Sequence, residues 1–207
     1  MNFTDYDVIS ACKGKIMQEA EALNAVAGQV DETYASAIHY ILECKGKVII
    51  TGLGKTGHIG KKIAASFASL GIPSFFIHSC ESLHGDLGMI SADDLLIMIS
   101  NSGKSQEILS MLPSIKRIGV KTISITQDKC SPLALNTDIA IEANSGEEID
   151  HLNLAPTASS TAALAVGDAL AVVACKIRGF KREDYALRHP AGALGQKLKD
   201  EYQRMVR

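Results

Sequence analysis

Several absences narrow what this 207-residue chain can be. It has no excess charge of one sign, since 21 Lys and Arg residues stand against 23 Asp and Glu residues. A broad electrostatic surface for nucleic acid or an anionic membrane is therefore not expected. No apolar run reaches the roughly 18 residues of a membrane span. The nearest run, "STAALAVGDALAVVAC", is interrupted by Asp168. The polar start "MNFTDYDVIS" disfavours a secretory signal, so we expect a cytoplasmic protein.

The cysteines lack the spacing of a metal site or a disulfide framework. They are scattered, odd in number and without a C-x-x-C pair: Cys12, Cys44, Cys80, Cys130 and Cys175. We expect reduced thiols that are mostly buried as small apolar side chains. The chain also shows no linker, repeat or low-complexity segment, and its length favours a single domain.

Hydrophobic periodicity divides the chain into helices and strands. Apolar residues at spacings of three and four predict helices in "VISACKGKIMQEAEALNAV" and "ETYASAIHYILEC", within residues 1–45. Five short apolar runs follow: "KVIITG", "PSFFIHS", "DLLIMISNS", "KTISIT" and "DIAIE". Helical stretches separate several of them, including 58–71 and 104–119, and a helix is predicted in "APTASSTAALAVGDALAVV". This alternation predicts a parallel sheet covered on both faces, with ligands bound beyond the carboxyl ends of its strands.

The turn after the first strand, "TGLGKTG", contains a G-x-G-x-x-G pattern and ends like a nucleotide-binding P-loop. A P-loop requires a glycine where this chain has Ile49, so that interpretation fails. A dinucleotide site requires an acid about 20 residues further on, at the end of the second strand. The second strand, "PSFFIHS", contains no carboxylate. Both nucleotide interpretations are therefore disfavoured.

The loop after the third strand indicates a smaller ligand. "SNSGKSQE" places the hydroxyls of Ser100, Ser102 and Ser105 and the amide of Asn101 around one glycine, where a helix begins. Hydroxyls beside the free N–H groups of a helix start suit a single phosphate monoester. An ordinary helix cap would use only one hydroxyl. The sequence thus favours a small phosphorylated ligand.

Several motifs occur together and in order: "GLGKTGHIGKKIAASFASLGIPSFFIH", "HGDLGMI", "ISNSGKSQEI", "LNLAPTASSTAALAVGDALAV" and "HPAGALGQKL". Over about residues 46–198 the chain resembles the sugar isomerase (SIS) domain family, and more closely the D-arabinose 5-phosphate isomerases. The resemblance implies a single SIS domain, 1–207, with an α/β fold: a three-layer α/β/α sandwich with a five-stranded parallel sheet, preceded by two N-terminal helices. It implies interconversion of D-ribulose 5-phosphate and D-arabinose 5-phosphate through a cis-enediol, without an organic cofactor. That reaction supplies synthesis of the sugar Kdo for lipopolysaccharide or capsule.

The resemblance also assigns residues. Lys55, Glu107, Glu148 and His189 match catalytic positions of the family. Ser100, Asn101, Ser102 and Ser105 match its phosphate loop, which Gly54 and Thr56 are expected to join. His84 is a candidate proton shuttle, and His78 is expected to line the pocket, where it could contact an inhibitory zinc ion although no metal is required. Each has a plainer interpretation: Lys55 as a solvated lysine, Glu107 as a helix-dipole partner and Glu148 as a surface acid. The sequence does not decide which of Glu107, Glu148 or the histidines transfers the proton.

Some residues depart from the family pattern. Lys104 replaces an acid beside the phosphate loop, which could tighten anion binding, and the segments around His151 and Ala191 also differ. The chain ends soon after Gly195, so we expect it to lack the family's pair of cystathionine-β-synthase-type regulatory domains. Two alternatives to the pentose phosphate remain: isomerisation of a hexulose or heptulose phosphate, and a non-catalytic sugar-phosphate-sensing module.

The N-terminal helices bear on assembly. Their apolar faces need cover, either from the chain's own domain or from other subunits. Ile9, Ile16 and Leu23 form one face, and Ile38, Ile41 and Leu42 form the other. Family members are usually tetramers, and His84 and His189 are predicted on loops that could be donated across a subunit interface. We therefore expect a homotetramer.

Overall fold

The computed structural model describes residues 4–191. Its centre is a five-stranded sheet in the order β2-β1-β3-β4-β5, in which every pairing is parallel. The strands are β1 (Val48–Gly52), β2 (Ser74–His78), β3 (Leu95–Ile99), β4 (Lys121–Thr126) and β5 (Ile139–Glu142). All five predicted strands are present, and the predicted parallel α/β sandwich is confirmed.

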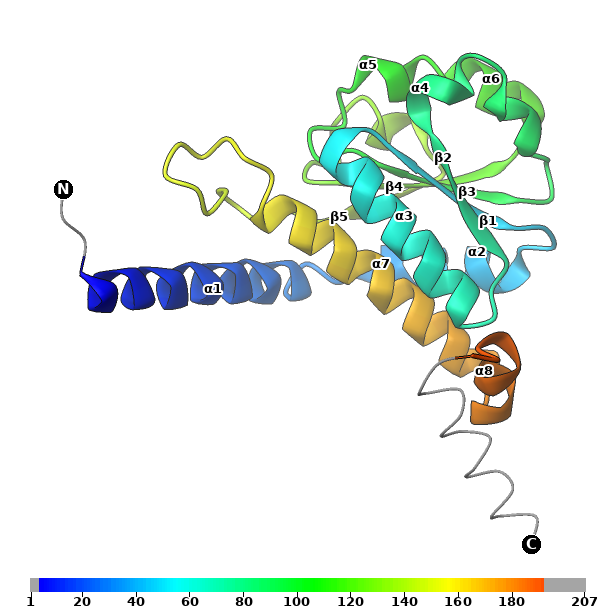
Figure 1. Cartoon of the computed structure of the whole chain (residues 1–207). Coiled ribbons are helices and arrows are strands. Elements are labelled where there is room, and N and C mark those ends of the chain that lie inside the picture. The colour runs from blue at the N-terminus through cyan, green and yellow to red at the C-terminus, as the bar shows by residue number, and fades with distance from the viewer. Residues whose placement is uncertain (1–3, 192–207) are drawn as a thin grey trace, which may run out of the picture.

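Helices cover both faces of the sheet (Figure 1). On one face lie α2 (Glu32–Glu43), α3 (Gly54–Ser69) and α7 (Ala158–Ile177), and on the other lie α4 (Ser79–Ser82), α5 (Gln106–Leu109) and α6 (Leu112–Ile118). Successive strand residues point to opposite faces of the sheet. Ile50 packs in the core beneath α2, α3 and α7, and Ile49 packs in the core beneath α5 and α6. This double burial explains why the strands are apolar throughout. Shorter elements complete the fold: η1 (Asp86–Met89), η2 (Ala134–Asn136) and α8 (Arg182–Arg188).

The single helical stretch expected over residues 104–119 is divided into α5 and α6. Pro113 stands in the first turn of α6, where its missing N–H has no intrahelical acceptor to lose. Further into a helix the same proline would remove a hydrogen bond, so the chain begins a new helix at Leu112. Gly119 ends α6 in the left-handed conformation with φ 76°.

Helix α7 is the main helix of the larger core. Within the described residues it is the one helix long and apolar enough to cross a membrane by composition, but more than half of its most apolar window is buried inside the fold, as in a core helix. A Cβ on Gly167 would lie 2.4 Å from Ile63, so glycine allows α3 and α7 to approach closely. Asp168 forms an ion pair with Lys62 of α3, so this acid joins the two helices.

Helix α1 (Asp5–Ala27) projects away from the sandwich (Figure 1). Its C-terminal end is anchored through the buried residues Ala22 and Val26, but Ile9 and Ile16 are 68% and 70% exposed. The chain's own domain therefore leaves this apolar face uncovered, whereas it buries Ile38 and Ile41 of α2. The expectation of mostly buried thiols is wrong for Cys12 and Cys130, which are exposed; of the five, only Cys175 is buried.

Candidate functional site

The glycine-rich turn connects β1 directly to α3. Gly54 has φ +57°, and a Cβ on Gly52 would lie 2.9 Å from the carbonyl of Thr56. Thr56 Oγ1 donates a hydrogen bond to the Leu53 carbonyl at 2.8 Å and accepts one from the Leu53 N–H at 3.2 Å. These glycines therefore permit close packing of a helix start on a strand end. Lys55 is exposed, and no side chain of the described residues hydrogen-bonds to it.

The serine loop is fixed to the neighbouring strand connection. Ser100 donates its backbone N–H to the Ile125 carbonyl at 3.1 Å, and Leu133 donates to the Gly103 carbonyl at 3.0 Å. Gly103 has φ +61°, and a Cβ there would lie 2.2 Å from the Ser131 hydroxyl. Only glycine fits both the conformation and the space. The loop is therefore held in one shape by β4 and the segment after it.

The hydroxyls of this loop are not used as ordinary helix caps. Ser105 precedes α5, yet its side chain accepts no hydrogen bond from that helix. Its Oγ lies 3.0 Å from Oγ of Ser100, which is buried. Ser102 is exposed and accepts a hydrogen bond from the Lys104 N–H at 3.2 Å. The loop thus presents paired hydroxyls beside a helix start, as a phosphate site requires.

Glu148 lies before α7 and is bound by the start of that helix. Its Oε2 accepts hydrogen bonds from Thr157 N–H at 2.8 Å, Thr157 Oγ1 at 3.0 Å and Ser159 N–H at 3.2 Å, while Ser159 Oγ donates to Oε1. Burial acts to raise the pKa of Glu148, but the hydrogen bonds from Ser159 and Thr157 outweigh it and lower the pKa. The plain interpretation of Glu148 as a solvated surface acid does not hold.

Three connections and two helix starts meet around one small cavity at the carboxyl edge of the sheet. Its polar lining consists of Thr56 from α3, Asn101 after β3, Thr126 at the end of β4 and Ser159 from α7. The Asn101 amide donates to Oε1 of Gln127 at 3.3 Å. The cavity joins the glycine turn, the serine loop and the Glu148 anchor. Their meeting at one edge agrees with the ligand position expected for a parallel sheet.

Sequence reasoning missed Thr126 and Gln127. A signal was present, because "KTISITQ" passes from apolar strand to polar residues at its carboxyl end, as the third strand does. Thr126 is buried, and its hydroxyl contacts the Asp128 carbonyl and the Ser131 hydroxyl. Thr126 therefore lines the cavity and also holds Ser131, which packs against Gly103 of the serine loop.

Three further candidates lie on the connections at this edge. Glu107 is half-buried in the first turn of α5, and no hydrogen bond to its carboxylate is formed within residues 4–191. His78 ends β2, and its Nδ1 accepts the Cys80 N–H at 3.3 Å while its ring meets Phe76 edge-on. His84 is exposed on the turn between α4 and η1.

His189 is not brought to this cluster within one chain. Its Nε2 lies 2.7 Å from the hydroxyl of Ser69, the last residue of α3, and its ring stacks on Tyr185 with centroids 3.8 Å apart. Thr56 and Ser69 stand 13 residues apart on α3, which is about 20 Å along the helix. The imidazole therefore lies near the opposite end of the sandwich. Residues 192–198, which the family resemblance also covers, lie outside the described residues.

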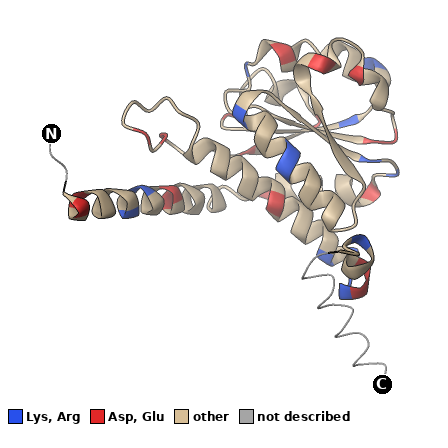
Figure 2. Cartoon of the chain, in the orientation of Figure 1, with Lys and Arg blue, Asp and Glu red and all other residues tan. Residues whose placement is uncertain are grey.

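Charge is distributed without a dominant sign near the site. Lys and Arg residues and Asp and Glu residues are both scattered over the helices and connections (Figure 2). A phosphorylated ligand would therefore be recognised by local groups, namely the serine loop and the adjacent helix starts, rather than by the field of the whole molecule.

Comparison with known proteins gives this geometry its context. The family model described as SIS domain matches residues 41–173. The chain belongs to the SIS domain family. It is 45% identical over 192 residues to arabinose 5-phosphate isomerase KdsD of Pseudomonas aeruginosa, covering 93% of this chain and 59% of that protein. It is 49% identical over 183 residues to KdsD of Francisella tularensis, covering 87% and 56%.

A solved structure of the family is also similar. E. coli CFT073 c3406 in complex with arabinose 5-phosphate superposes with a TM-score of 0.89 at 43% identity, covering 91% of this chain and all of that one. The chain spans less than three fifths of the length of the curated relatives named above. The family resemblance expected from the motifs is thus confirmed, and so is the SIS fold.

Proposed function

We propose that this SIS domain is an aldose–ketose isomerase that interconverts D-ribulose 5-phosphate and D-arabinose 5-phosphate. The observation that carries the proposal is the Ser100–Ser105 hydroxyl pair, uncommitted to helix capping, on the same sheet edge as the anchored carboxylate of Glu148. The similarity to enzymes named arabinose 5-phosphate isomerase, and to a solved complex with that sugar phosphate, supports it. No organic cofactor takes part in the proposed reaction.

In this proposal the serine loop anchors the phosphate. Ser100, Ser102 and Ser105 offer hydroxyls, and Asn101 and Thr56 line the adjoining cavity. Gly54 allows the turn that brings Thr56 there. Binding energy from the distant phosphate holds C1 and C2 of the sugar over the catalytic groups. His78, at the end of β2, is assigned to the wall of the same pocket.

The chemical step moves one proton between C2 and C1. A base removes the proton from C2 of the aldose to form the cis-enediol, and the proton returns to C1 to give the ketose. We assign this role to one of the two carboxylates and steadying of the enediolate oxygens to Lys55. The hydrogen bonds on Glu148 keep it ionised but weaken it as a base, whereas Glu107 has none among the described residues. Comparing Glu107→Gln with Glu148→Gln separates the two assignments.

We further propose that the active enzyme is a homotetramer with composite sites. His189 lies about 20 Å along α3 from the turn that carries Thr56, so a role in catalysis requires a neighbouring subunit's site. His84, exposed after α4, is the second candidate for donation. One or both imidazoles would shuttle the proton needed for ring opening. The proposed location is the cytoplasm, and the product would feed Kdo synthesis for lipopolysaccharide or capsule.

The test is incubation of the purified protein with ribulose 5-phosphate in deuterium oxide, with the products identified by NMR. We expect arabinose 5-phosphate carrying deuterium at C2, because the transferred proton exchanges with solvent in the enediol. Exchange only with a hexulose or heptulose phosphate would reassign the substrate. Sugar-phosphate binding without exchange would identify a sensing module instead.

A further inference from the structure

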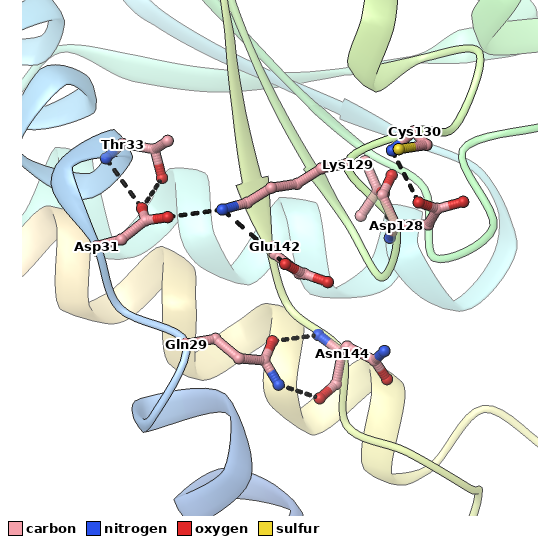
Figure 3. Close-up of polar contacts among 9 residues, drawn as sticks. Gln29, Asp31, Thr33, Asp128, Lys129, Cys130, Glu142 and Asn144 are labelled. Carbon is pink, nitrogen blue, oxygen red and sulfur yellow. Dashed lines mark hydrogen bonds and ion pairs between the residues drawn. The ribbon is translucent and has the colours of Figure 1, made fainter.

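The linker between α1 and α2 reaches the point where the last strand leaves the sheet. Gln29, on this linker, forms two hydrogen bonds with the main chain of Asn144: its Nε2 donates to the Asn144 carbonyl at 2.7 Å, and its Oε1 accepts the Asn144 N–H at 2.9 Å (Figure 3). One side-chain amide thus satisfies both main-chain polar groups of a single residue. The two residues are 115 positions apart in the sequence.

The contact lies on the open side of the sheet. β5 is the last strand in the order, and Ala143 still pairs with β4 by donating its N–H to the Thr126 carbonyl at 2.7 Å. The next residue, Asn144, directs its N–H and carbonyl to Gln29. The chain is therefore held from one side at residue 143 and from the other at residue 144, which fixes both the position and the direction in which it leaves the sheet.

A group of three charged side chains joins the same two segments. Lys129, after β4, lies 2.6 Å from the carboxylate of Asp31 and 3.9 Å from that of Glu142 (Figure 3). Asp31 caps α2 by accepting the Thr33 N–H at 3.0 Å, and Glu142 ends β5. The hydrogen bond from Lys129 is the largest cause lowering the pKa of Asp31 to about 2. These groups are partly exposed, so salt screens them, whereas the amide contact of Gln29 does not depend on charge.

The segment that begins at Asn144, where Gln29 binds, ends at Glu148 four residues later. Oδ1 of Asn144 accepts the Gly146 N–H at 3.0 Å, and two residues later Glu148 donates its own N–H to Asn153 Oδ1 at 2.7 Å. The carboxylate of Glu148 then anchors the start of α7. Glu148 lies only four residues after Asn144, and the hydrogen bonds at Gly146 and Glu148 restrict the conformation of the segment between them.

We propose that Gln29 is a positioning residue: by binding both main-chain groups of Asn144, it sets where the segment 144–148 leaves the sheet and therefore where Glu148 stands in the site. This inference rests on the proposed function, in which Glu148 serves the isomerisation. It also connects the projecting helix α1 to the site, because Gln29 immediately follows Gly28, the C-cap residue of α1.

The test compares three variants of the full chain. Gln29→Met keeps the length of the side chain and removes both hydrogen bonds, and Gln29→Glu keeps the acceptor for the Asn144 N–H but loses the donor. Gln18→Met is the matched control, since Gln18 is exposed on α1 and, among the described residues, its side chain hydrogen-bonds only with Lys15. We expect Gln29→Met to lower kcat by roughly tenfold to a hundredfold. KM should change little because the side-chain hydrogen bonds of Gln29 go to Asn144 and not to the serine loop, and Gln29→Glu should recover part of the loss.

Hydrogen–deuterium exchange provides a readout that does not depend on activity. We expect the amides of residues 145–149 to exchange faster in Gln29→Met than in wild type, with Gln18→Met unchanged. Wild-type kcat together with wild-type exchange in Gln29→Met would overturn the proposal, as would an equal loss of kcat in Gln18→Met. If Gln29→Met does not fold, Gln29→Glu is compared with wild type instead. Because it loses one of the two hydrogen bonds, it should still lower kcat and speed exchange, though less than Gln29→Met. An inactive wild type would refute the proposed function, and the exchange data would still decide the positioning claim.

Discussion

Ser105 illustrates how one hydroxyl can distinguish a structural role from a functional one. It occupies the position that normally caps a helix, but its Oγ faces Ser100 and accepts nothing from α5. An uncommitted hydroxyl contributes little to stability and is available to a ligand. Replacing it should therefore separate binding from folding.

We predict that Ser105→Ala weakens sugar-phosphate binding while leaving stability nearly unchanged. Loss of one hydrogen bond to a charged group costs about 1.5–3 kcal/mol, equivalent to at least tenfold in Kd. Ser110→Ala, at the exposed end of α5, is the control. Isothermal titration with ribulose 5-phosphate and thermal unfolding measure the two effects. Unchanged affinity in Ser105→Ala would mean that the phosphate binds elsewhere.

Glu148 should show a pH-dependent contribution to stability. Its folded-state pKa is lowered, so the contribution is present above the ordinary glutamate pKa of 4.5 and is lost as pH falls through the lower folded value. Glu148→Gln should cost about 1 kcal/mol near neutral pH, as for loss of a helix N-cap. The difference from wild type should shrink below pH 4.5.

Denaturant unfolding at several pH values tests the Glu148 prediction. Glu147→Gln is a suitable control because Glu147 is the exposed neighbour and its side chain makes no hydrogen bond within the described part of the chain. A difference between Glu148→Gln and wild type that stays constant down to pH 3 would show that the carboxylate charge does not hold α7.

The regular elements were predictable because their cause is local. Each strand is a short apolar run, and a parallel sheet requires such runs, so "DLLIMIS" and "KTISIT" identified buried strands directly. The division between α5 and α6 was missed because the apolar period continues across Pro113. The contact of Gln29 with Asn144 could not be predicted, since nothing in either segment specifies a partner 115 residues away.

The loop elements depend on glycines whose neighbours are remote in sequence. We predict that Gly103→Ala destabilises the protein by about 2 kcal/mol or more, because alanine is strained at positive φ and its Cβ would collide with Ser131. Gly88→Ala should cost far less, since no atom lies within 4 Å of a Cβ there. Differential scanning calorimetry of the two variants tests this, and equal losses would contradict it.

The candidate site was predictable only in part. The serine loop was found because hydroxyls cluster visibly in "SNSGKS", and Thr56 was found through the glycine turn. Thr126 was missed because a single threonine at a strand end does not form a visible cluster of hydroxyl residues in the sequence. His189 lies far from the cavity in its own chain, and a linear sequence contains no information on which copy of the chain a side chain serves.

At the scale of the whole molecule, helix α1 stands out because Ile9 and Ile16, on one of its faces, are not covered by the described part of the same chain. We predict that Ile9→Ser combined with Ile16→Ser shifts the protein to smaller species in sedimentation velocity, because both side chains are more than two thirds exposed in one chain. Gln18→Ser, on the opposite side of α1, should leave the assembly unchanged. A wild-type monomer with full activity would refute the tetramer.

Shared sites would also appear in mixed assemblies. Inactive His189→Ala and Glu148→Gln chains, refolded together, should regain part of the activity if each site takes these residues from different subunits. Mixed tetramers without activity would instead place the complete site within one chain.

The hydrogen bonds between the Gln29 side chain and the main chain of Asn144 also bear on how copies of this chain can associate. A sheet that ends in a bare strand offers a row of unpaired N–H and carbonyl groups to any second strand, and such edges promote aggregation. Here β5 has only four residues, Glu142 and Lys129 place charges beside it, and the Gln29 amide occupies the polar groups immediately after it. The linker therefore covers the polar main-chain groups at the end of this edge strand, an arrangement that disfavours edge-to-edge pairing of two sheets.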